Sequence, residues 1–376
     1  MKESPRPAAR VSTLELFFDL VFVFTITQVA HLVAHAHGAL DLTKAFLILT
    51  IAWWMYGGYA WLTNNLGTTG LTIRLLLLTG MAAYFVMALS IPHADGEDGL
   101  PFAISFLFVT IIHAVLFLHA PNASALAILK IAPFNLVGAL FIVAAALLGP
   151  TRSWLGWLAA VVTFAASSLA RRERGFHVSA SHFAERHGLV IIVAIGESVV
   201  AIGVGAADIP VRLPLIAAAV LGFALAATIW WCYFDRDDVR GEHALANVGA
   251  KERASVAMYA YSYGHLVMVA AIVLVAAGMQ DVITGIRTPP PRATYWLLGT
   301  GIALYLGGMA LFRRLLHTAT IRVRLVAAAL ALATVPIGVA LGALAQLALL
   351  VVLMLSLLAV EQRGAERQSS SEIKAA

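Results

Sequence analysis

Acidic residues inside long apolar runs are the first candidates for chemistry in this sequence. Glu197 stands in the segment AIGESVVAIG, ten residues after His187 and about 15 Å further along a helix at 1.5 Å per residue. A carboxylate at that depth in a membrane is costly and usually faces a protein interior or a hydrated path. Glu197, with Ser198 beside it, is therefore a candidate for a proton or cation relay. The alternative is a protonated acid that hydrogen-bonds a neighbouring helix.

Two further acids open the first apolar run. Ser12-Thr13-Leu14-Glu15 has the form of a capping box, so Glu15 is expected to satisfy free amides at a helix start. Asp19 follows one turn deeper on the same face and has no capping role. We expect Asp19 to pair with an arginine such as Arg10 or Arg186, or to belong to a gate. Glu185 and Arg186 are candidates for the same network.

Histidines suggest a metal site only weakly. His31 and His35 are four residues apart and share a helix face, which is a metal-ligand spacing, but only Asp41 offers a third ligand nearby. Interfacial histidines satisfied by water are the alternative, so neither a metal nor any other cofactor is expected.

Single polar residues lie inside other apolar runs. His113, Asn135 and His265 are predicted to form hydrogen bonds between helices, and His265 is also kept as a relay candidate. The pairs Trp53-Trp54 and Trp230-Trp231 stand near the ends of runs, where an interfacial aromatic belt explains them.

Patterns of soluble active sites are missing from the sequence. It contains no Walker A, GxSxG, HExxH or Rossmann pattern in a strand–helix context, and its single cysteine, Cys232, excludes an internal disulfide or a CxxC site. No catalytic residue is therefore assigned. The net charge of +5 is attributed to membrane topology, so no nucleic-acid partner is expected.

The elements that carry these residues are predicted to be membrane-spanning helices. The chain is 61% hydrophobic and 12% charged, whereas soluble domains are about half apolar and about a quarter charged. A span needs about 20 apolar residues. Runs of suitable length lie near residues 14–36, 41–62, 71–91, 102–119, 125–148, 154–170, 187–206, 212–233, 255–278, 294–312, 321–340 and 343–360. The sequence thus predicts an all-α, polytopic integral membrane bundle of about twelve helices.

The cations predict the orientation of these spans. With the N-terminus inside, 20 of the 25 lysines and arginines fall in cytoplasmic segments, and the outer segments hold only Lys44, Arg152, Arg212, Arg287 and Arg292. Such an excess marks the cytoplasmic side. Both termini are therefore expected in the cytoplasm. The first run shows no signal-peptide cleavage site and is expected to remain in the mature protein.

The two halves of the sequence resemble each other. Glu15 opens ELFFDLVFVFTITQV and is followed by Trp53-Trp54-Met55-Tyr56, while Glu185 opens ERHGLVIIVAIGESV and is followed by Trp230-Trp231-Cys232-Tyr233. This pattern predicts a 6+6 parallel repeat, a plan that recurs in transporters. The expected division is a cytoplasmic tail (1–12), a first six-helix repeat (13–170), a second with a cytoplasmic linker at its start (171–360), and a disordered cytoplasmic tail (361–376).

Several of these segments are similar to the bacterial low-temperature-requirement A family. The resemblance rests on LELFFDLVFVFTITQVAHL, on HFAERHGLVIIVAIGESVVAIG and on the WW-x-Y and YSYGHL segments, and it covers about Thr13 to Leu358. It implies an integral membrane protein of the bacterial plasma membrane that is linked to growth in the cold, with no established biochemical activity. The motif positions it carries over are Glu15, Phe18, Asp19, His182, Glu185, Arg186, Glu197, Ser198 and His265. The chain departs from the family pattern at residues 64–70, where NNLGTTG replaces a more acidic segment.

Three functions fit these observations. The first is a secondary transporter or permeation protein for an unknown small solute or ion, with Glu197 as the protonatable group and Asp19, Glu185 and Arg186 as a cytoplasmic-side network. The second is an intramembrane lipid-modifying enzyme, for which no nucleophile–base pair is found. The third is a non-catalytic membrane organiser. The lipid bilayer is the one partner expected in all three.

Overall fold

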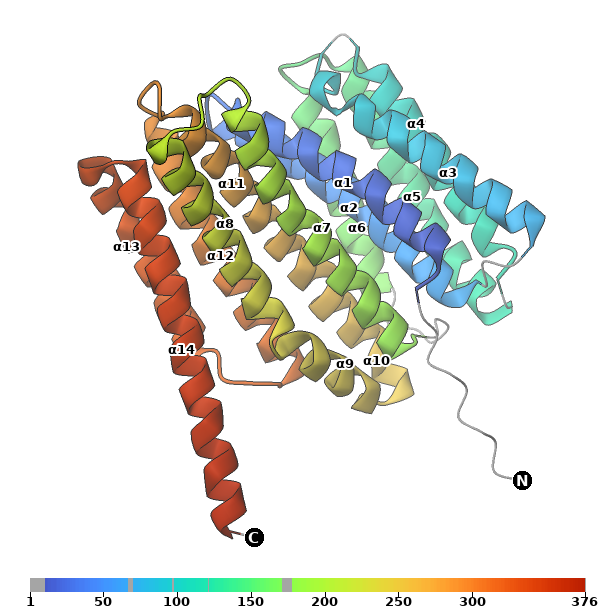
Figure 1. Ribbon diagram of the computed structural model, residues 1–376. Coiled ribbons are helices and arrows are strands. Elements are labelled where there is room, and N and C mark those ends of the chain that lie inside the picture. Colours follow the sequence, from blue (N-terminus) through green and yellow to red (C-terminus); the bar gives the residue numbers. More distant parts are fainter. Residues whose placement is uncertain (1–10, 67–69, 97, 121, 171–177, 376) are drawn as a thin grey trace. The chain divides into compact units, whose positions relative to one another are not determined.

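The structure is a computed structural model that describes residues 11–66, 70–96, 98–120, 122–170 and 178–375, of which 122–127, 168–170 and 368–375 are described by their backbone alone. Helices dominate it (Figure 1), and the described residues form no strand. The helices are α1 (Thr13–Ala34), α2 (Ala39–Asn65), α3 (Leu71–Leu89), α4 (Leu100–Phe117), α5 (Asn122–Leu147), α6 (Ser153–Ala170), α7 (Ala180–Ala206), α8 (Leu213–Phe234), α9 (Asp237–Asn247), α10 (Ala250–Ala257), α11 (Gly264–Thr284), α12 (Arg292–Leu316), α13 (Arg322–Leu341) and α14 (Ala343–Ala375), with short η1 (Ile91–His93) and η2 (Met258–Tyr263).

Each of the twelve predicted apolar runs coincides with a helix. Within the described residues, eleven helical segments are long and apolar enough to cross a membrane. The twelfth run corresponds to α6, an apolar helix of 18 residues whose side chains are described over Ser153–Ser167. The prediction of a polytopic helical membrane protein is therefore confirmed.

Two helices extend beyond their predicted boundaries. α7 begins at Ala180, seven residues before the predicted run, so His182, Glu185 and Arg186 lie in its first turns. α14 continues to Ala375, so most of residues 361–376, expected to be a disordered tail, is helical. The added residues at both helix ends are mostly polar or charged, and they are stabilised by polar partners. Hydropathy detects only apolar residues, so it placed both boundaries at the edges of the apolar runs.

The chain divides into two compact units. Unit 1 comprises the described residues up to Val193 together with Glu242–Ser262, and unit 2 comprises Ala194–Gly241 and the described residues from Tyr263. Within unit 1, α3 packs on α4, α4 on α5, α5 on α6, and α2 on α6. Within unit 2, α11 packs on α12, α12 on α13, α13 on α14, and α8 on α14. These four pairings follow the same order along the chain in the two units, whereas α1 packs on α2 and α3 and α7 has no corresponding set among the larger contacts between described residues.

Glycines make the tight turns that precede α6 and α14. Gly149 before α6 has φ +73°, and Gly342 before α14 has φ +100°. Both values are in the region that favours glycine because it has no Cβ atom. Proline lies inside the preceding helix in each unit, at Pro133 of α5 and Pro336 of α13.

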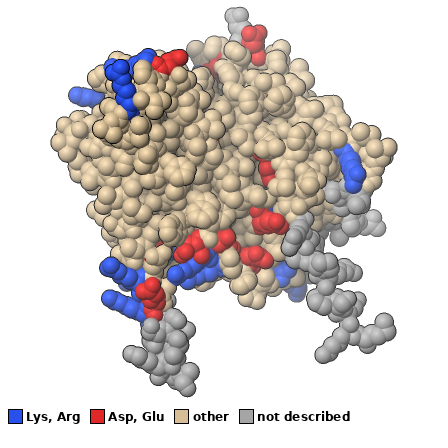
Figure 2. All heavy atoms as spheres, viewed as in Figure 1, with Lys and Arg blue, Asp and Glu red and all other residues tan. Residues whose placement is uncertain are grey.

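Charged side chains gather mainly near the ends of the helices on the face drawn in Figure 2. The surface between them is formed by other residues. Among the described residues, many large apolar side chains are exposed, including Leu20, Val162, Val220 and Val326. Exposed apolar area of this extent is expected where lipid covers a protein.

Candidate functional site

The candidate site begins at the first turn of α1. The Ser12 hydroxyl accepts a hydrogen bond from the Glu15 amide (3.4 Å), and Glu15 Oε2 accepts one from the Ser12 amide (2.8 Å). The predicted capping box is therefore confirmed. Glu15 is nevertheless buried, so its carboxylate also needs partners beyond α1.

Those partners come from α7, whose first turns lie beside α1. Arg186 Nη1 lies 3.0 Å from Glu15 Oε1, and Arg186 Nη2 lies 3.1 Å from Asp19 Oδ1. His182 Nε2 lies 3.1 Å from Glu15 Oε1. The expected pairing of Asp19 with Arg186 is confirmed, whereas Arg10 lies outside the described residues. These four residues, Glu15, Asp19, His182 and Arg186, are called the α1–α7 network below.

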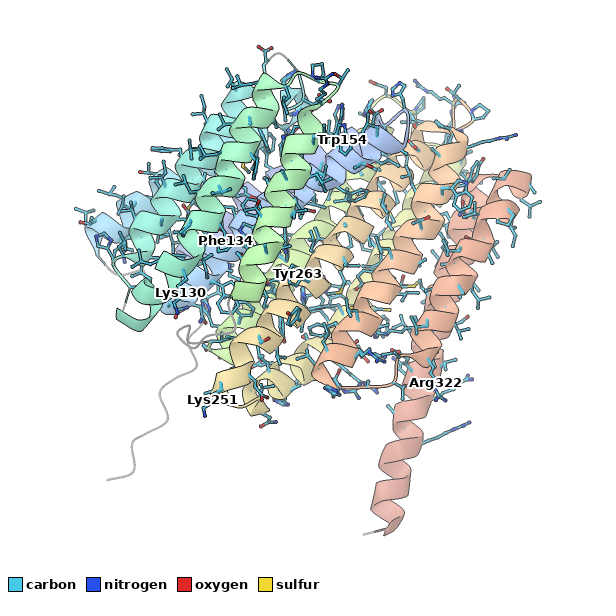
Figure 3. All side chains as sticks on the ribbon, turned by 180° about the vertical axis from the view of Figure 1, so that it is seen from behind. Lys130, Phe134, Trp154, Lys251, Tyr263 and Arg322 are labelled. Atoms are coloured by element: carbon cyan, nitrogen blue, oxygen red, sulfur yellow. The ribbon has the colours of Figure 1, made fainter. Side chains whose placement is uncertain are left out.

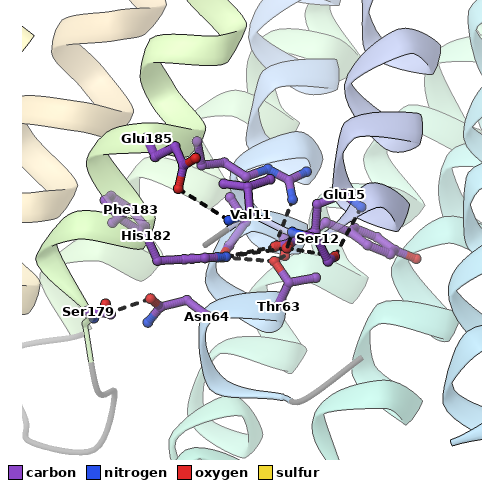
Figure 4. A network of polar contacts seen from close by, with 12 residues as sticks. Val11, Ser12, Glu15, Thr63, Asn64, Ser179, His182, Phe183 and Glu185 are labelled. Atoms are coloured by element: carbon purple, nitrogen blue, oxygen red, sulfur yellow. Dashed lines mark hydrogen bonds and ion pairs between the residues drawn. The ribbon is translucent and has the colours of Figure 1, made fainter. Parts of the chain in front are cut away.

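The α1–α7 network is shielded from water. Arg186 is 1% exposed, Asp19 2% and Glu15 3%. Figure 4 shows His182 extending from α7 toward Glu15, with Thr63 of α2 close by. A guanidinium with two carboxylates at this level of burial is stable only because each charge meets an opposite charge at close range.

Aromatic rings enclose the guanidinium and Asp19. The Tyr56 hydroxyl donates a hydrogen bond to Asp19 Oδ1 (2.9 Å), and the Arg186 guanidinium carbon lies 5.6 Å from the centre of the Tyr56 ring and 5.9 Å from that of Phe18. Phe22 stacks on Tyr56 at 4.3 Å, and Tyr84 meets Phe18 edge-on at 5.2 Å. Rings at these distances favour a cation and lower the local dielectric constant, which strengthens the ion pairs.

The charges of the α1–α7 network do not balance without a proton or a cation. Two ionised carboxylates face one guanidinium, so one negative charge is left over unless His182 or an acid is protonated. Within the described residues, Asp19 Oδ2 and His182 Nδ1 are buried and make no hydrogen bond. The arrangement can therefore hold one exchangeable positive charge next to Asp19 or on His182.

Glu185 is not part of this network. Its side chain is exposed and accepts a hydrogen bond from the Val11 amide (3.2 Å), as the dashed line in Figure 4 shows. Glu185 therefore holds the chain segment that leads into α1, while the next residue, Arg186, points to the interior.

Three other predicted residues, Glu197, Ser198 and His265, lie in unit 2. Glu197 is 4% exposed in the middle of α7, and Ser198 beside it is fully buried. His265 Nε2 and the Tyr233 hydroxyl are 2.8 Å apart, and Phe312 packs edge-on against the His265 ring. The predicted hydrogen bonds between helices are confirmed for His265 and also for Asn135, which accepts one from the Trp54 indole (3.0 Å).

The weak metal candidates stay separate from the network. The rings of His31 and His35 are 4.1 Å apart near the far end of α1, and His37 and His35 direct Nδ1 at backbone carbonyls. Within the part of the chain that the structure describes, no group of three or more His, Cys, Asp and Glu residues is arranged to hold a metal ion.

Trp53 was misread as an interfacial residue. It is buried, and its indole donates a hydrogen bond to the Ser262 carbonyl (2.8 Å) in η2, a π-helical turn. A π turn shifts the backbone hydrogen-bond register, so a carbonyl can accept a side-chain donor. Trp230 and Trp231 are both exposed, which agrees with the predicted belt.

Sequence reasoning missed a second ionic cluster, which lies in unit 2. Asp237 lies 2.9 Å from Arg313 and 2.8 Å from Arg324, and Glu361 lies 2.6 Å from Arg313 and 3.0 Å from Arg324. We call this closed set of four the arginine–acid ring. Arg313 and Arg324 are among the 20 cations that the charge count assigns to cytoplasmic segments, and both are buried. The signal that could have found them is Glu361, an acid directly after an apolar run on the arginine-rich side.

The fold and the site together define a polytopic helical membrane protein with a buried ionic network near one end of its first helix. The profile of the family described as bacterial low temperature requirement A protein (LtrA) matches residues 10–359, and the chain belongs to this family. It is 26% identical over 283 residues to the uncharacterized protein RA0937 of Rhizobium meliloti (strain 1021). This match covers 72% of the present chain and 68% of RA0937. The resemblance seen in the sequence motifs is thereby confirmed.

Proposed function

We propose that the chain is a secondary transporter or permeation protein whose α1–α7 network binds the coupling proton or cation. The observation that carries this proposal is the charge imbalance of the network, in which Glu15 and Asp19 face the single guanidinium of Arg186. An ionic network that only held two helices together would be most stable if its buried positive and negative charges were equal in number. A group that must be neutralised by a mobile positive charge is suited to coupling instead.

The environment of Asp19 supports reversible protonation or cation binding. One of its oxygens is already used by Tyr56 and Arg186, while Oδ2 is buried and has no hydrogen-bond partner among the described residues. A proton or small cation arriving there would remove the excess negative charge. When the proton or cation left, the two ionised acids would again face the single guanidinium of Arg186. The excess negative charge would then favour a different arrangement of α1 and α7.

Glu197 is proposed as a second protonatable group on the same helix. It stands eleven residues after Arg186, about 16 Å along α7 at 1.5 Å per residue, and it is buried. Ser198 and His265 remain candidates for the same relay. Two acids at different depths would allow a proton to pass in steps.

The internal repeat is proposed as the basis for alternating access. It is supported by the shared packing order, by Pro133 and Pro336 in the fifth helix of each half, and by the glycine turns at Gly149 and Gly342 that follow. In addition, a buried tyrosine hydroxyl donates a hydrogen bond to the backbone carbonyl of the residue that precedes each tryptophan pair. Tyr84 donates to Ala52 in the first half, and Tyr305 donates to Ile229 in the second. Transporters with parallel repeats place the substrate path between their halves.

The test is dissipation of an imposed pH gradient by the purified protein in proteoliposomes that contain a pH-sensitive dye. Asp19→Asn should lower the protein-dependent rate at least about tenfold because it removes the neutralisable charge. Glu252→Gln is the matched control, since it removes an exposed acid at the start of α10 and should leave the rate unchanged. Equal protein-dependent rates for both variants would remove Asp19 from the mechanism, and a wild-type rate no faster than that of protein-free liposomes would favour a membrane organiser over a transporter.

A further inference from the structure

A cavity lined by both charged and apolar residues lies in unit 2 and shares no residue with the α1–α7 network. It measures about 380 Å³ and is bounded by the end of α8, the start of α9, the turn between α12 and α13, and the middle of α14. Four arginines and three acids line it: Arg236, Arg240, Arg313, Arg324, Asp235, Asp237 and Glu361. The lining therefore carries a net charge of +1, from +4 and −3.

The arginine–acid ring forms a neutral part of this lining. Arg313 and Arg324 are each held by both Asp237 and Glu361, so their charges are compensated within the ring. Arg324 also donates to the Cys232 carbonyl and Arg313 to the Thr320 carbonyl. These contacts fix the cavity wall, because moving any one of the four side chains would leave a buried charge unpaired.

Hydrogen-bond donors remain available beside the ring. Arg240 follows Arg236 by four residues on a continuous helical backbone, so both line the cavity from the same side. Arg236 pairs with Asp235, whereas Arg240 makes no ion pair with any described residue. The Thr318 hydroxyl is buried and makes no hydrogen bond within the described residues. A guanidinium and a hydroxyl of this kind are typical ligands of a phosphate oxygen.

The position of the cavity suggests where such a phosphate would come from. Its lining includes the exposed apolar residues Trp231 near the end of α8, Val323 at the start of α13 and Val360, the last apolar residue before the charged part of α14. Tryptophan beside arginine at a helix end is typical of the membrane–water boundary. Basic pockets between spanning helices at that boundary bind anionic lipid head groups.

We propose that this cavity binds a phosphate group, supplied by an anionic phospholipid whose acyl chains lie along α13 and α14. Arg240 and Thr318 bind the phosphate oxygens, and Arg240 supplies the one positive charge that the ion pairs of the lining leave uncompensated. The arginine–acid ring holds the site in shape without itself giving up its ion pairs. This site is independent of the proposed transport activity, since it shares no residue with the α1–α7 network.

The test uses native mass spectrometry of the full-length protein, purified in neutral detergent and titrated with short-chain lipids. Phosphatidylglycerol should bind at one site more tightly than zwitterionic phosphatidylcholine. Arg240→Gln and Thr318→Val should each weaken binding about tenfold, the effect of losing one charge-assisted or buried hydrogen bond. Both variants should keep the wild-type unfolding temperature, because neither side chain has a partner among the described residues.

The matched control is Lys251→Gln at the start of α10. Lys251 (labelled in Figure 3) is exposed, is predicted to lie on the same side of the membrane and does not line the cavity. If Lys251→Gln weakened lipid binding as much as Arg240→Gln, the proposal would be overturned. The lipid would then be attracted by the overall positive charge of the protein rather than by this cavity. Binding of inorganic phosphate with the same dependence on Arg240 and Thr318, without lipid binding, would keep the phosphate site and assign it to a soluble anion. Binding of neither probe would remove the site.

Discussion

Arg186 is the residue on which the α1–α7 network depends most. It meets Glu15 and Asp19 at 3.0 and 3.1 Å and is almost completely buried. We expect Arg186→Gln to lower the free energy of unfolding by about 3–5 kcal/mol, because two buried carboxylates would lose their cation. The double variant Asp19→Asn/Arg186→Gln should be more stable than Arg186→Gln alone. Thermal unfolding in detergent measures both.

The control for this prediction is Lys251→Gln, an exposed substitution that should change stability by less than about 0.5 kcal/mol. If the double variant lost as much stability as the two single variants combined, the residues would act independently. The ion pair would then contribute nothing of its own.

Local patterns predicted some contacts of the site and could not predict others. The capping box and the pairing of Asp19 with Arg186 follow from spacing and from the need of a buried acid for a cation. The role of His182 and the arginine–acid ring depend on tertiary packing, which brings α7 to α1 and Glu361 to Asp237. No periodicity in the sequence encodes which helix faces which.

At the scale of the helices, glycines set how closely α12 can approach α11. A Cβ atom on Gly301 would lie 2.7 Å from Val275 Cγ2 and 3.1 Å from the Ala271 carbonyl oxygen. We expect Gly301→Ala to destabilise the protein by about 1–3 kcal/mol, since a backbone atom cannot move aside as a side chain can. Unfolding in detergent would show this as a lowered midpoint temperature.

Gly307 on the same helix provides the comparison. A Cβ atom there would meet nothing within 4 Å. Gly307→Ala should therefore be neutral or stabilise the protein by up to about 1 kcal/mol through helix propensity. If Gly301→Ala and Gly307→Ala destabilised the protein by the same amount, the close packing of α11 and α12 would not explain the loss of stability.

Helix boundaries were less predictable than the helices themselves. Hydropathy identified all twelve runs, but it started α7 too late and ended α14 too early. Both errors fall where charged residues continue a helix and are stabilised by ion pairs, through Arg186 in one case and Glu361 in the other. A hydropathy pattern treats such residues as loop because it contains no information about their partners.

At the scale of the whole molecule, the number of crossings depends on α6. α6 (Ser153–Ala170) is 18 residues long, the same length as α4 and close to the minimum for a membrane span. If α6 crosses the membrane, both termini lie on the same side and the arginine-rich helix ends face the cytoplasm. We therefore expect a green fluorescent protein fusion at the C-terminus to fluoresce, and an alkaline phosphatase fusion after Gly149 to be active. Phosphatase activity at the C-terminus would mean that α6 does not cross.

The central claim concerns the exchangeable positive charge in the α1–α7 network, and proton flux in a folded variant tests it most directly. Asp19→Asn/Arg186→Gln removes one acid and its cation together, so it should remain folded while it loses the site that needs neutralising. In proteoliposomes with an imposed pH gradient, we predict that this variant dissipates the gradient no faster than liposomes without protein, whereas the wild type does so at least about tenfold faster. A wild-type rate in the folded double variant would contradict the account.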